Sequence, residues 1–146
     1  MFDAYIDKST LAIEKYGAGA QVDNYLFIVC TRGSCRINVY ISEYEVRPNH
    51  IITLLPNSYF RIIEQSDDAE LYILSFDQRT LTASHLFSSI IEHIIYFTEH
   101  PVIELSSSAI DIMCSYIELL MRIDTNLNIG SNQEFVGAIL YQFLVW

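Results

Sequence analysis

Hydrophobic and polar residues alternate through the middle of the chain. The clearest alternation runs from Cys35 to Ile41, with Ile37 and Val39 as the apolar positions between them. This period places one face of a β-strand in a core and leaves the other face in water. Together with five other short apolar runs between residues 25 and 76, it predicts six strands with tight connections. Such spacing is typical of an antiparallel sandwich or barrel.

Turn-forming residues separate the predicted strands. They occur at Gly33-Ser34, Ser42-Glu43, Pro48-Asn49, Pro56-Asn57 and residues 65–68. Before the first strand, residues 1–24 show no clear period, and Gly17–Ala20 interrupts any helix or strand there. We therefore expect residues 1–24 to be an N-terminal arm and residues 25–78 to form the barrel.

After Asp77 the apolar period becomes helical. A stripe from Leu86 to Phe97 predicts a first helix that ends at Pro101, followed by a short extended link to Leu105. A second helix is expected to open with a capping motif at Ser108 and to end near residue 126. We expect residues 79–146 to be a helical region that dimerises.

A third helix is expected to open with the capping box Ser131–Glu134. Its apolar face continues to Trp146 without a C-cap glycine or a closing basic residue. The simplest interpretation is a truncated linker helix in a piece of a longer protein. A natural C-terminus that docks into the core is the alternative.

The charge of the chain argues against direct contact with nucleic acid. Eight basic residues stand against eighteen acidic ones, for a net charge of −10, so the surface would repel a phosphate backbone.

Three cysteines without a Cys-x-x-Cys pair, no signal peptide and no long apolar run favour a cytoplasmic protein that does not enter a membrane.

Catalytic motifs are missing from the sequence. It contains no Gly-x-Ser-x-Gly elbow and no glycine-rich phosphate loop. His85, His93 and His100 lie too far apart along one helix to share a metal ion, and His50 follows a turn. We therefore expect no enzyme, no catalytic residues, no metal and no cofactor.

The order of these elements resembles the N-terminal region of AraC-family transcription regulators. The stretches that carry the resemblance are Phe27–Ile37, Tyr44–Asn57 and Tyr72–Asp77. The resemblance implies an α+β fold, a cupin-like antiparallel β-barrel followed by two to three α-helices. It also implies a small-molecule effector in the barrel, dimerising helices, and DNA contact only through C-terminal helix-turn-helix motifs that this sequence does not contain.

The sequence departs from the cupin pattern at the metal site. Phe60 stands where that pattern places a metal-binding histidine, and residues 24–30 contain no His-x-His. Because a transition metal needs three or four converging ligands, metal-dependent chemistry is not expected.

Alternation also nominates residues for a ligand pocket. It points Cys35, Ile37, Val39, Phe60 and Ile62 inward, and Tyr72 is the sixth candidate. Polar contacts to a ligand would come from neighbours such as Arg36, Tyr59, Arg61 or Tyr72, whose facing the alternation does not fix. The alternative is a barrel filled by its own side chains.

The second helix supplies candidates for a dimer interface. They are Met113, Tyr116, Ile117, Leu120 and Ile123, which pack against the barrel, against a second copy of the chain, or both. We thus expect the effector-binding and dimerisation domain of an AraC-type regulator. The alternatives are a metal-free cupin enzyme of the sugar-isomerase type and a ligand-free structural dimerisation module.

Overall fold

The computed structural model describes residues 2–8, 16–77, 96 and 98–126. Nine strands and one helix lie in these ranges: β1 Phe2–Asp7, β2 Ala20–Gln21, β3 Tyr25–Arg32, β4 Cys35–Val39, β5 Ser42–Val46, β6 His50–Leu54, β7 Tyr59–Gln65, β8 Glu70–Phe76, β9 Val102–Glu104 and α4 Ser107–Asn126.

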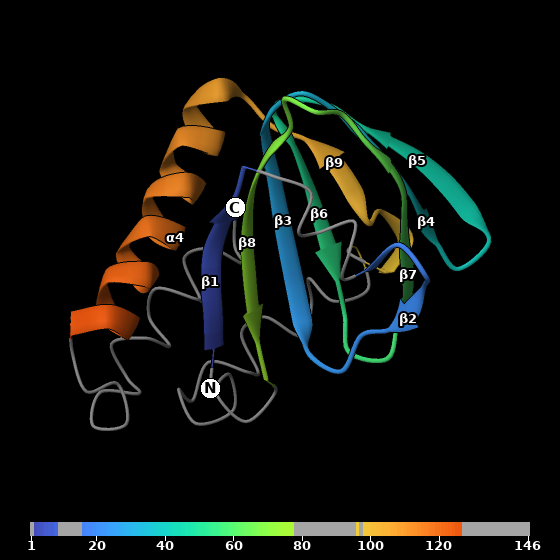
Figure 1. Ribbon diagram of the computed structural model, residues 1–146, viewed down its shortest axis with the longest axis horizontal. Helices are drawn as coiled ribbons and strands as arrows, with labels where there is room; N and C mark the ends of the chain where they lie inside the picture. Colours follow the sequence, from blue (N-terminus) through green and yellow to red (C-terminus); the bar gives the residue numbers. More distant parts are fainter. Residues whose placement is uncertain (1, 9–15, 78–95, 97, 127–146) are drawn as a thin grey trace.

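The strands form two antiparallel sheets that face each other (Figure 1). The first has the order β1-β8-β3-β6-β9, and the second has the order β2-β7-β4-β5. Apolar side chains from both fill the space between them, among them Ile28, Ile37 and Ile73, which are at most 1% exposed. We call this cluster the intersheet core.

A closed barrel was predicted, and the described strands form two separate sheets instead. The chain leaves the first sheet at the end of β3, where the register with β8 shifts between Cys30 and Arg32. A turn at Gly33, with φ +69°, then starts β4 in the second sheet. The bulge and turn carry the chain between sheets without a ladder that joins them.

Residues 1–24 were predicted to be an N-terminal arm, and the first segment of this range forms a strand. β1 pairs along its whole length with β8, from Phe2 opposite Phe76 to Asp7 opposite Leu71. The short strand β2 pairs with β7 in the other sheet. Apolar Phe2, Ala4 and Ile6 do alternate with other residues in β1, and pairing with β8 satisfies the backbone of this short strand.

The predicted turn at Ser42-Glu43 lies two residues too late. Val39 pairs with Ser42, so the turn consists of Tyr40 and Ile41. Tyr40 adopts φ +55°, and Ile41 is 99% exposed and does not belong to the buried face of β4. Alternation alone did not reveal this turn, because both of its residues are large and apolar where glycine or asparagine is usual.

Both predicted Pro-Asn turns are confirmed. Asn49 and Asn57 have φ values of +74° and +73°. The turns close through backbone hydrogen bonds, in which His50 donates to Arg47 at 3.1 Å and Ser58 donates to Leu55 at 3.2 Å. Proline followed by a residue with positive φ is the signature of a type II turn.

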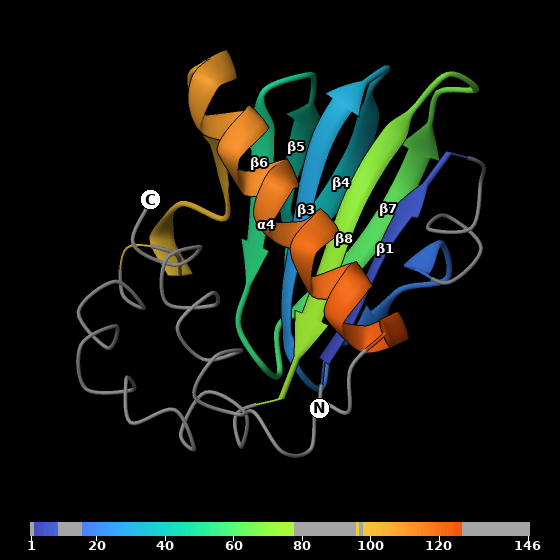
Figure 2. The ribbon, with the colours of Figure 1, turned by 90° about the vertical axis from the view of Figure 1, so that its left-hand side faces the viewer.

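Helix α4 covers the outer face of the first sheet (Figure 2). It begins at Ser107, and the Ser106 hydroxyl caps it by accepting a hydrogen bond from the Ala109 N–H at 3.2 Å, so the cap lies two residues before the predicted one. Ile110, Met113, Ile117 and Leu120 pack on Phe27 and Phe76. This is the helix–sheet core.

Among the described residues there is one α-helix, where two to three were predicted. The other two predicted helices fall mainly on residues 78–95 and 127–146, outside the described ranges. The chain also forms one more strand after residue 77, because the three-residue strand β9 pairs with β6. The predicted extended link at residues 101–105 contains this strand.

Candidate functional site

Five of the six predicted pocket residues come together in the intersheet core. Cys35, Ile37, Val39, Phe60 and Ile62 point inward from β4 and β7 and are at most 7% exposed. Tyr72 lies apart from them. Its side chain is on the outer face of β8, and its hydroxyl donates a hydrogen bond to Glu118 of α4 at 3.0 Å. Successive residues of a strand face opposite sides, so Tyr72 faces away from inward-pointing Leu71 and Ile73.

The other polar neighbours predicted to hold a ligand lie on the exposed side of the second sheet. The Arg36 guanidinium donates to Glu64 at 2.8 Å and 3.1 Å on the exposed side of the second sheet. The Arg61 Nε donates to the Gly17 carbonyl oxygen at 3.0 Å. Tyr59 is 44% exposed beside Gly19.

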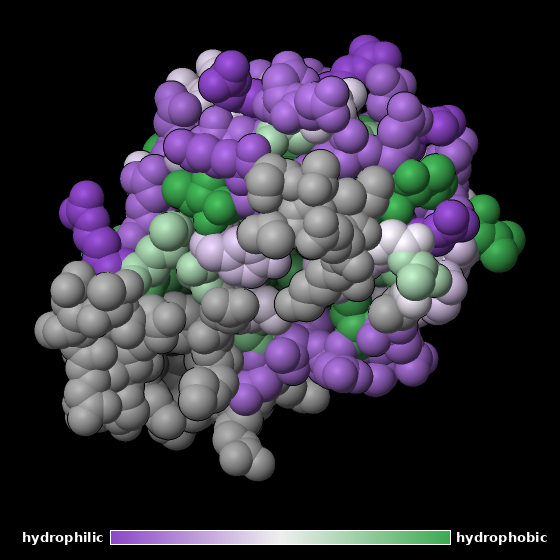
Figure 3. All heavy atoms as spheres, viewed as in Figure 1, coloured by the Kyte–Doolittle hydropathy of each residue, from purple (hydrophilic) through white to green (hydrophobic). Residues whose placement is uncertain are grey.

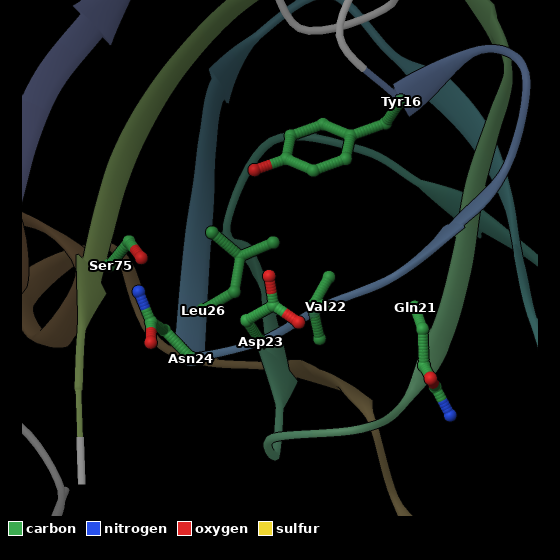
Figure 4. Close-up of a pocket in the computed structure, with 7 residues that line it drawn as sticks. All are labelled: Tyr16, Gln21, Val22, Asp23, Asn24, Leu26 and Ser75. Carbon is green, nitrogen blue, oxygen red and sulfur yellow. The ribbon is translucent and has the colours of Figure 1, made fainter.

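A cavity of about 260 Å³ opens at one end of the intersheet core (Figure 4). Three parts of the chain line it: the segment from Tyr16 to Gln21, the loop that leads to β3, and the paired ends of β3 and β8. The residues are Tyr16, Gln21, Val22, Asp23, Asn24, Leu26 and Ser75. We call this cavity the end pocket.

Strand pairing positions one wall of the end pocket. Leu26 of β3 lies opposite Ser75 of β8, and both face the space between the sheets. The loop before β3 is held by two backbone hydrogen bonds, from Val22 N–H to Ser58 at 2.9 Å and from Asn57 N–H to Val22 at 2.6 Å. This loop therefore has a defined backbone path under the cavity.

Tyr16 forms the opposite wall. Its ring packs edge-on against Phe60, with centroids 5.3 Å apart, and the residue is 8% exposed. In Figure 4 the ring lies across the pocket from Val22, Asp23 and Leu26. The Gly19 N–H donates to the Tyr16 carbonyl at 3.1 Å, and the bond from Arg61 to Gly17 holds the same segment on β7.

The end pocket combines an apolar floor with polar groups. Val22 and Leu26 supply the floor, while Asp23, Asn24 and Ser75 supply a carboxylate, an amide and a hydroxyl. Figure 4 shows the Asn24 amide and the Ser75 hydroxyl pointing toward one another, and Gln21 pointing away. An apolar cavity with a few converging polar groups is typical of a small-molecule binding site.

The described residues gather no metal-ligating cluster, and the two thiols of the intersheet core are buried. Within the described ranges, no three His, Cys, Asp or Glu side chains come together in a way that could hold a metal ion. Burial raises the pKa of the Cys30 thiol to about 11 and that of Cys35 to about 12. Thiols with a raised pKa are poor nucleophiles.

His50 lies at the first position of β6, with both ring nitrogens engaged. Its Nδ1 accepts a hydrogen bond from the Arg47 N–H at 2.9 Å, and its Nε2 lies 3.6 Å from a Glu104 carboxylate oxygen. The ring is therefore oriented by its own turn and by β9.

Three predicted dimer-interface residues are buried within the chain. Met113, Ile117 and Leu120 are at most 3% exposed in the helix–sheet core, and Tyr116 is partly buried against it. Ile123 lies within α4. Met113, Ile117 and Leu120 therefore pack against the sheet of their own chain, which is one of the alternatives given for this face. A role of the five residues in a dimer stays a prediction.

Pocket residues Tyr16, Asp23, Asn24 and Ser75 were not predicted from the sequence. Tyr16, Asp23 and Asn24 were assigned to the arm. Ser75 carried a weak signal, because it is a polar residue between the buried Leu74 and Phe76. A polar residue on an inward face of a strand often marks a site.

Much of the face shown in Figure 3 is hydrophilic, with hydrophobic residues in small separate patches. The helix in the described ranges lacks the combination of length and apolar character needed to cross a membrane.

Comparison with solved structures identifies the fold. The chain is similar to the AraC-like transcriptional activator CuxR, with a TM-score of 0.54 and 13% identity over 99% of this chain and 49% of that chain. ToxT from Vibrio cholerae strain SCE256 gives a TM-score of 0.52 and 10% identity over 97% of this chain and 50% of that one. ToxT from Vibrio cholerae O395 gives 0.51 and 12%, over 98% and 52%.

The chain spans about half the length of these regulators. No curated protein sequence matches it. The family model of the AraC-like ligand binding domain matches residues 15–144, which is most of the sequence. The chain therefore belongs to the family of AraC-like ligand-binding domains.

Proposed function

We propose that the chain is the sensing domain of an AraC-type transcription regulator and binds a small-molecule effector in the end pocket. DNA contact belongs to a helix-turn-helix region outside this sequence. The end pocket is the observation that carries the proposal, because it is a cavity with an apolar floor and polar groups in a chain of a ligand-binding family.

The Tyr16 segment offers a route from the pocket to the rest of a regulator. Tyr16 lines the pocket, and residues 17–21 run along β7 through the Arg61 hydrogen bond and the β2–β7 pairing. A ligand shifts the equilibrium between two placements of this segment only as far as it binds one placement more tightly than the other. A coupling of about 1–3 kcal/mol changes occupancy several-fold or more.

A pocket-filling variant tests the binding site. Ser75→Phe places a ring in the end pocket, whereas Ser42→Phe adds the same ring on exposed β5. A thermal-shift screen with small metabolites of positive, neutral and negative charge is run on all three proteins. We expect at least one compound to raise the Tm of the wild type and of Ser42→Phe but not that of Ser75→Phe. A screen in which no compound raises the Tm, or in which Ser75→Phe responds equally, contradicts the proposal.

The homodimer is part of the proposal. Because Met113, Ile117 and Leu120 fill the helix–sheet core, a helix pair would use Tyr116 and Leu119, the latter 38% exposed. We expect the chain to sediment as a dimer at micromolar concentration and Leu119→Arg to sediment as a monomer. Ser42→Arg is the control for added charge. A monomeric wild type in analytical ultracentrifugation contradicts the dimer but not the ligand site.

The enzyme alternative receives less support than the sensor. A metal-free isomerase needs an acid–base pair of His or Tyr beside its substrate. His50 is engaged with Arg47 and Glu104, and the family match is to a ligand-binding domain of regulators. Turnover of a sugar derivative by the purified chain would support the alternative.

A further inference from the structure

We propose that the effector carries a positively charged ammonium group and that Asp23 binds it in the end pocket. This inference rests on the proposed function and adds the chemical class of the ligand. The geometry behind it is a carboxylate, an aromatic ring and two neutral polar groups around one cavity of about 260 Å³.

Asp23 is the carboxylate of the pocket lining. It is exposed at the pocket, and no described side chain forms an ion pair with it. The carboxylates of Glu43, Glu45 and Glu64, by contrast, each lie within 4 Å of an arginine. A carboxylate at a cavity whose charge is not neutralised by its neighbours attracts a cationic ligand.

Tyr16 supplies the second element of an ammonium site. Its ring is 8% exposed and lies across the cavity from Asp23 (Figure 4). A cation near an aromatic face is attracted by the negative potential of that face. A site between a carboxylate and a buried ring therefore favours an ammonium group over a neutral group of the same size.

The remaining lining fits the rest of such a ligand. The Ser75 hydroxyl can accept a hydrogen bond from an N–H group, the Asn24 amide lies beside it, and Val22 and Leu26 offer apolar surface to carbon atoms. The cavity volume of about 260 Å³ is large enough for a short alkyl or aryl amine.

The charge of the whole chain acts in the same direction. A net charge of −10 raises the local concentration of cations and lowers that of anions. A ligand with a carboxylate or phosphate group would be repelled both by this negative field and by the Asp23 carboxylate. The field and the pocket therefore select for the same sign of charge.

Three probes of similar size but different charge test the inference: n-butylammonium, n-butanol and n-butyrate. Binding is followed at low ionic strength by the shifts of backbone amide NMR signals of residues 21–26. We expect n-butylammonium to bind about tenfold more tightly than n-butanol, since a charge-assisted contact contributes roughly 1.5 kcal/mol, and n-butyrate to bind most weakly.

Charge-matched variants separate the pocket carboxylate from the general field. Asp23→Asn keeps the shape of the side chain and is expected to weaken n-butylammonium binding about tenfold while leaving n-butanol unchanged. Asp67→Asn removes the same charge from the exposed turn between β7 and β8 and is expected to change binding less than about twofold.

Two results overturn the inference while leaving the sensor in place: n-butanol or n-butyrate binding as tightly as n-butylammonium, or Asp23→Asn behaving like Asp67→Asn. The proposed function itself fails by a different measurement, when no compound of the thermal-shift screen stabilises the wild type.

Discussion

Arg61 donates a hydrogen bond from its Nε to the carbonyl oxygen of Gly17, 3.0 Å away, and so attaches the segment that carries Tyr16 to β7. The two residues are separated by 44 positions in the chain. Their contact joins the wall of the end pocket to the second sheet. The placement of Tyr16 thus depends on a strand whose own side chains fill the intersheet core.

Replacement of Arg61 by methionine keeps most of the length of the side chain and removes this hydrogen bond. We expect the free energy of unfolding to fall by about 0.5–1.5 kcal/mol, because an exposed hydrogen bond contributes that much at most. Cleavage by a protease near residues 17–21 should accelerate more than global unfolding does. Arg47→Met, which removes only the exposed ion pair with Glu45, is the control and should leave cleavage unchanged.

Two glycines with positive φ are expected to differ in their tolerance of alanine. A Cβ on Gly33 would lie 2.7 Å from the backbone of Ala69, which cannot move away easily. A Cβ on Gly19 would meet the hydroxyl of Tyr59, the end of a side chain that is 44% exposed and can rotate. Gly33→Ala should therefore cost more than about 2 kcal/mol in urea unfolding, and Gly19→Ala about 1 kcal/mol. Equal losses would contradict this difference.

The turn at Tyr40 is expected to be stabilised by asparagine. Tyr40 has φ +55° and is 58% exposed, so its backbone is strained while its side chain has little burial to lose. Asparagine tolerates this conformation, and Tyr40→Asn should raise the free energy of unfolding by about 1 kcal/mol. Ile41→Asn, at a position without positive φ, is the control and should change stability by less than about 0.5 kcal/mol. A destabilised Tyr40→Asn protein would show that the ring makes a contact that matters more than the strain.

Alkaline pH should destabilise the packing of α4 on the sheet. Burial, and then the hydrogen bond to Glu118, raise the pKa of Tyr72 from 10.0 to about 12. Burial raises the pKa of Cys114 from 9.0 to about 12. Both groups lose their protons more readily in the unfolded chain, so stability present below pH 9 falls as the pH rises to about 12.

Tyr72→Phe tests the share of the tyrosine. The variant removes one ionisable group, so its stability should fall less steeply between about pH 10 and about pH 12 than that of the wild type. Urea midpoints at a series of pH values measure the two slopes. Parallel slopes would show that Tyr72 does not contribute to the alkaline loss.

The sequence by itself determined several local features. Alternation in β4 correctly placed Cys35, Ile37 and Val39 on one buried face. Pro48-Asn49 and Pro56-Asn57 were predicted as turns, and the positive φ of both asparagines explains why. These features depend on neighbouring residues and on backbone sterics, which the order of amino acids specifies directly.

Tertiary structure decided which face of an apolar strand points into the intersheet core and which face packs against α4. β3 and β8 belong to a sheet that is covered on one side by the other sheet and on the other side by α4, so both of their faces are apolar. A strand buried on both sides shows no alternation of apolar and polar residues, and for this reason the sequence did not fix the face on which Tyr72 lies. The pairing of β1 with β8 and the approach of Tyr16 to residues 21–26 likewise depend on contacts between segments far apart in the chain. The end pocket exists only where these segments meet, and a sequence pattern that is local in range does not specify such a meeting.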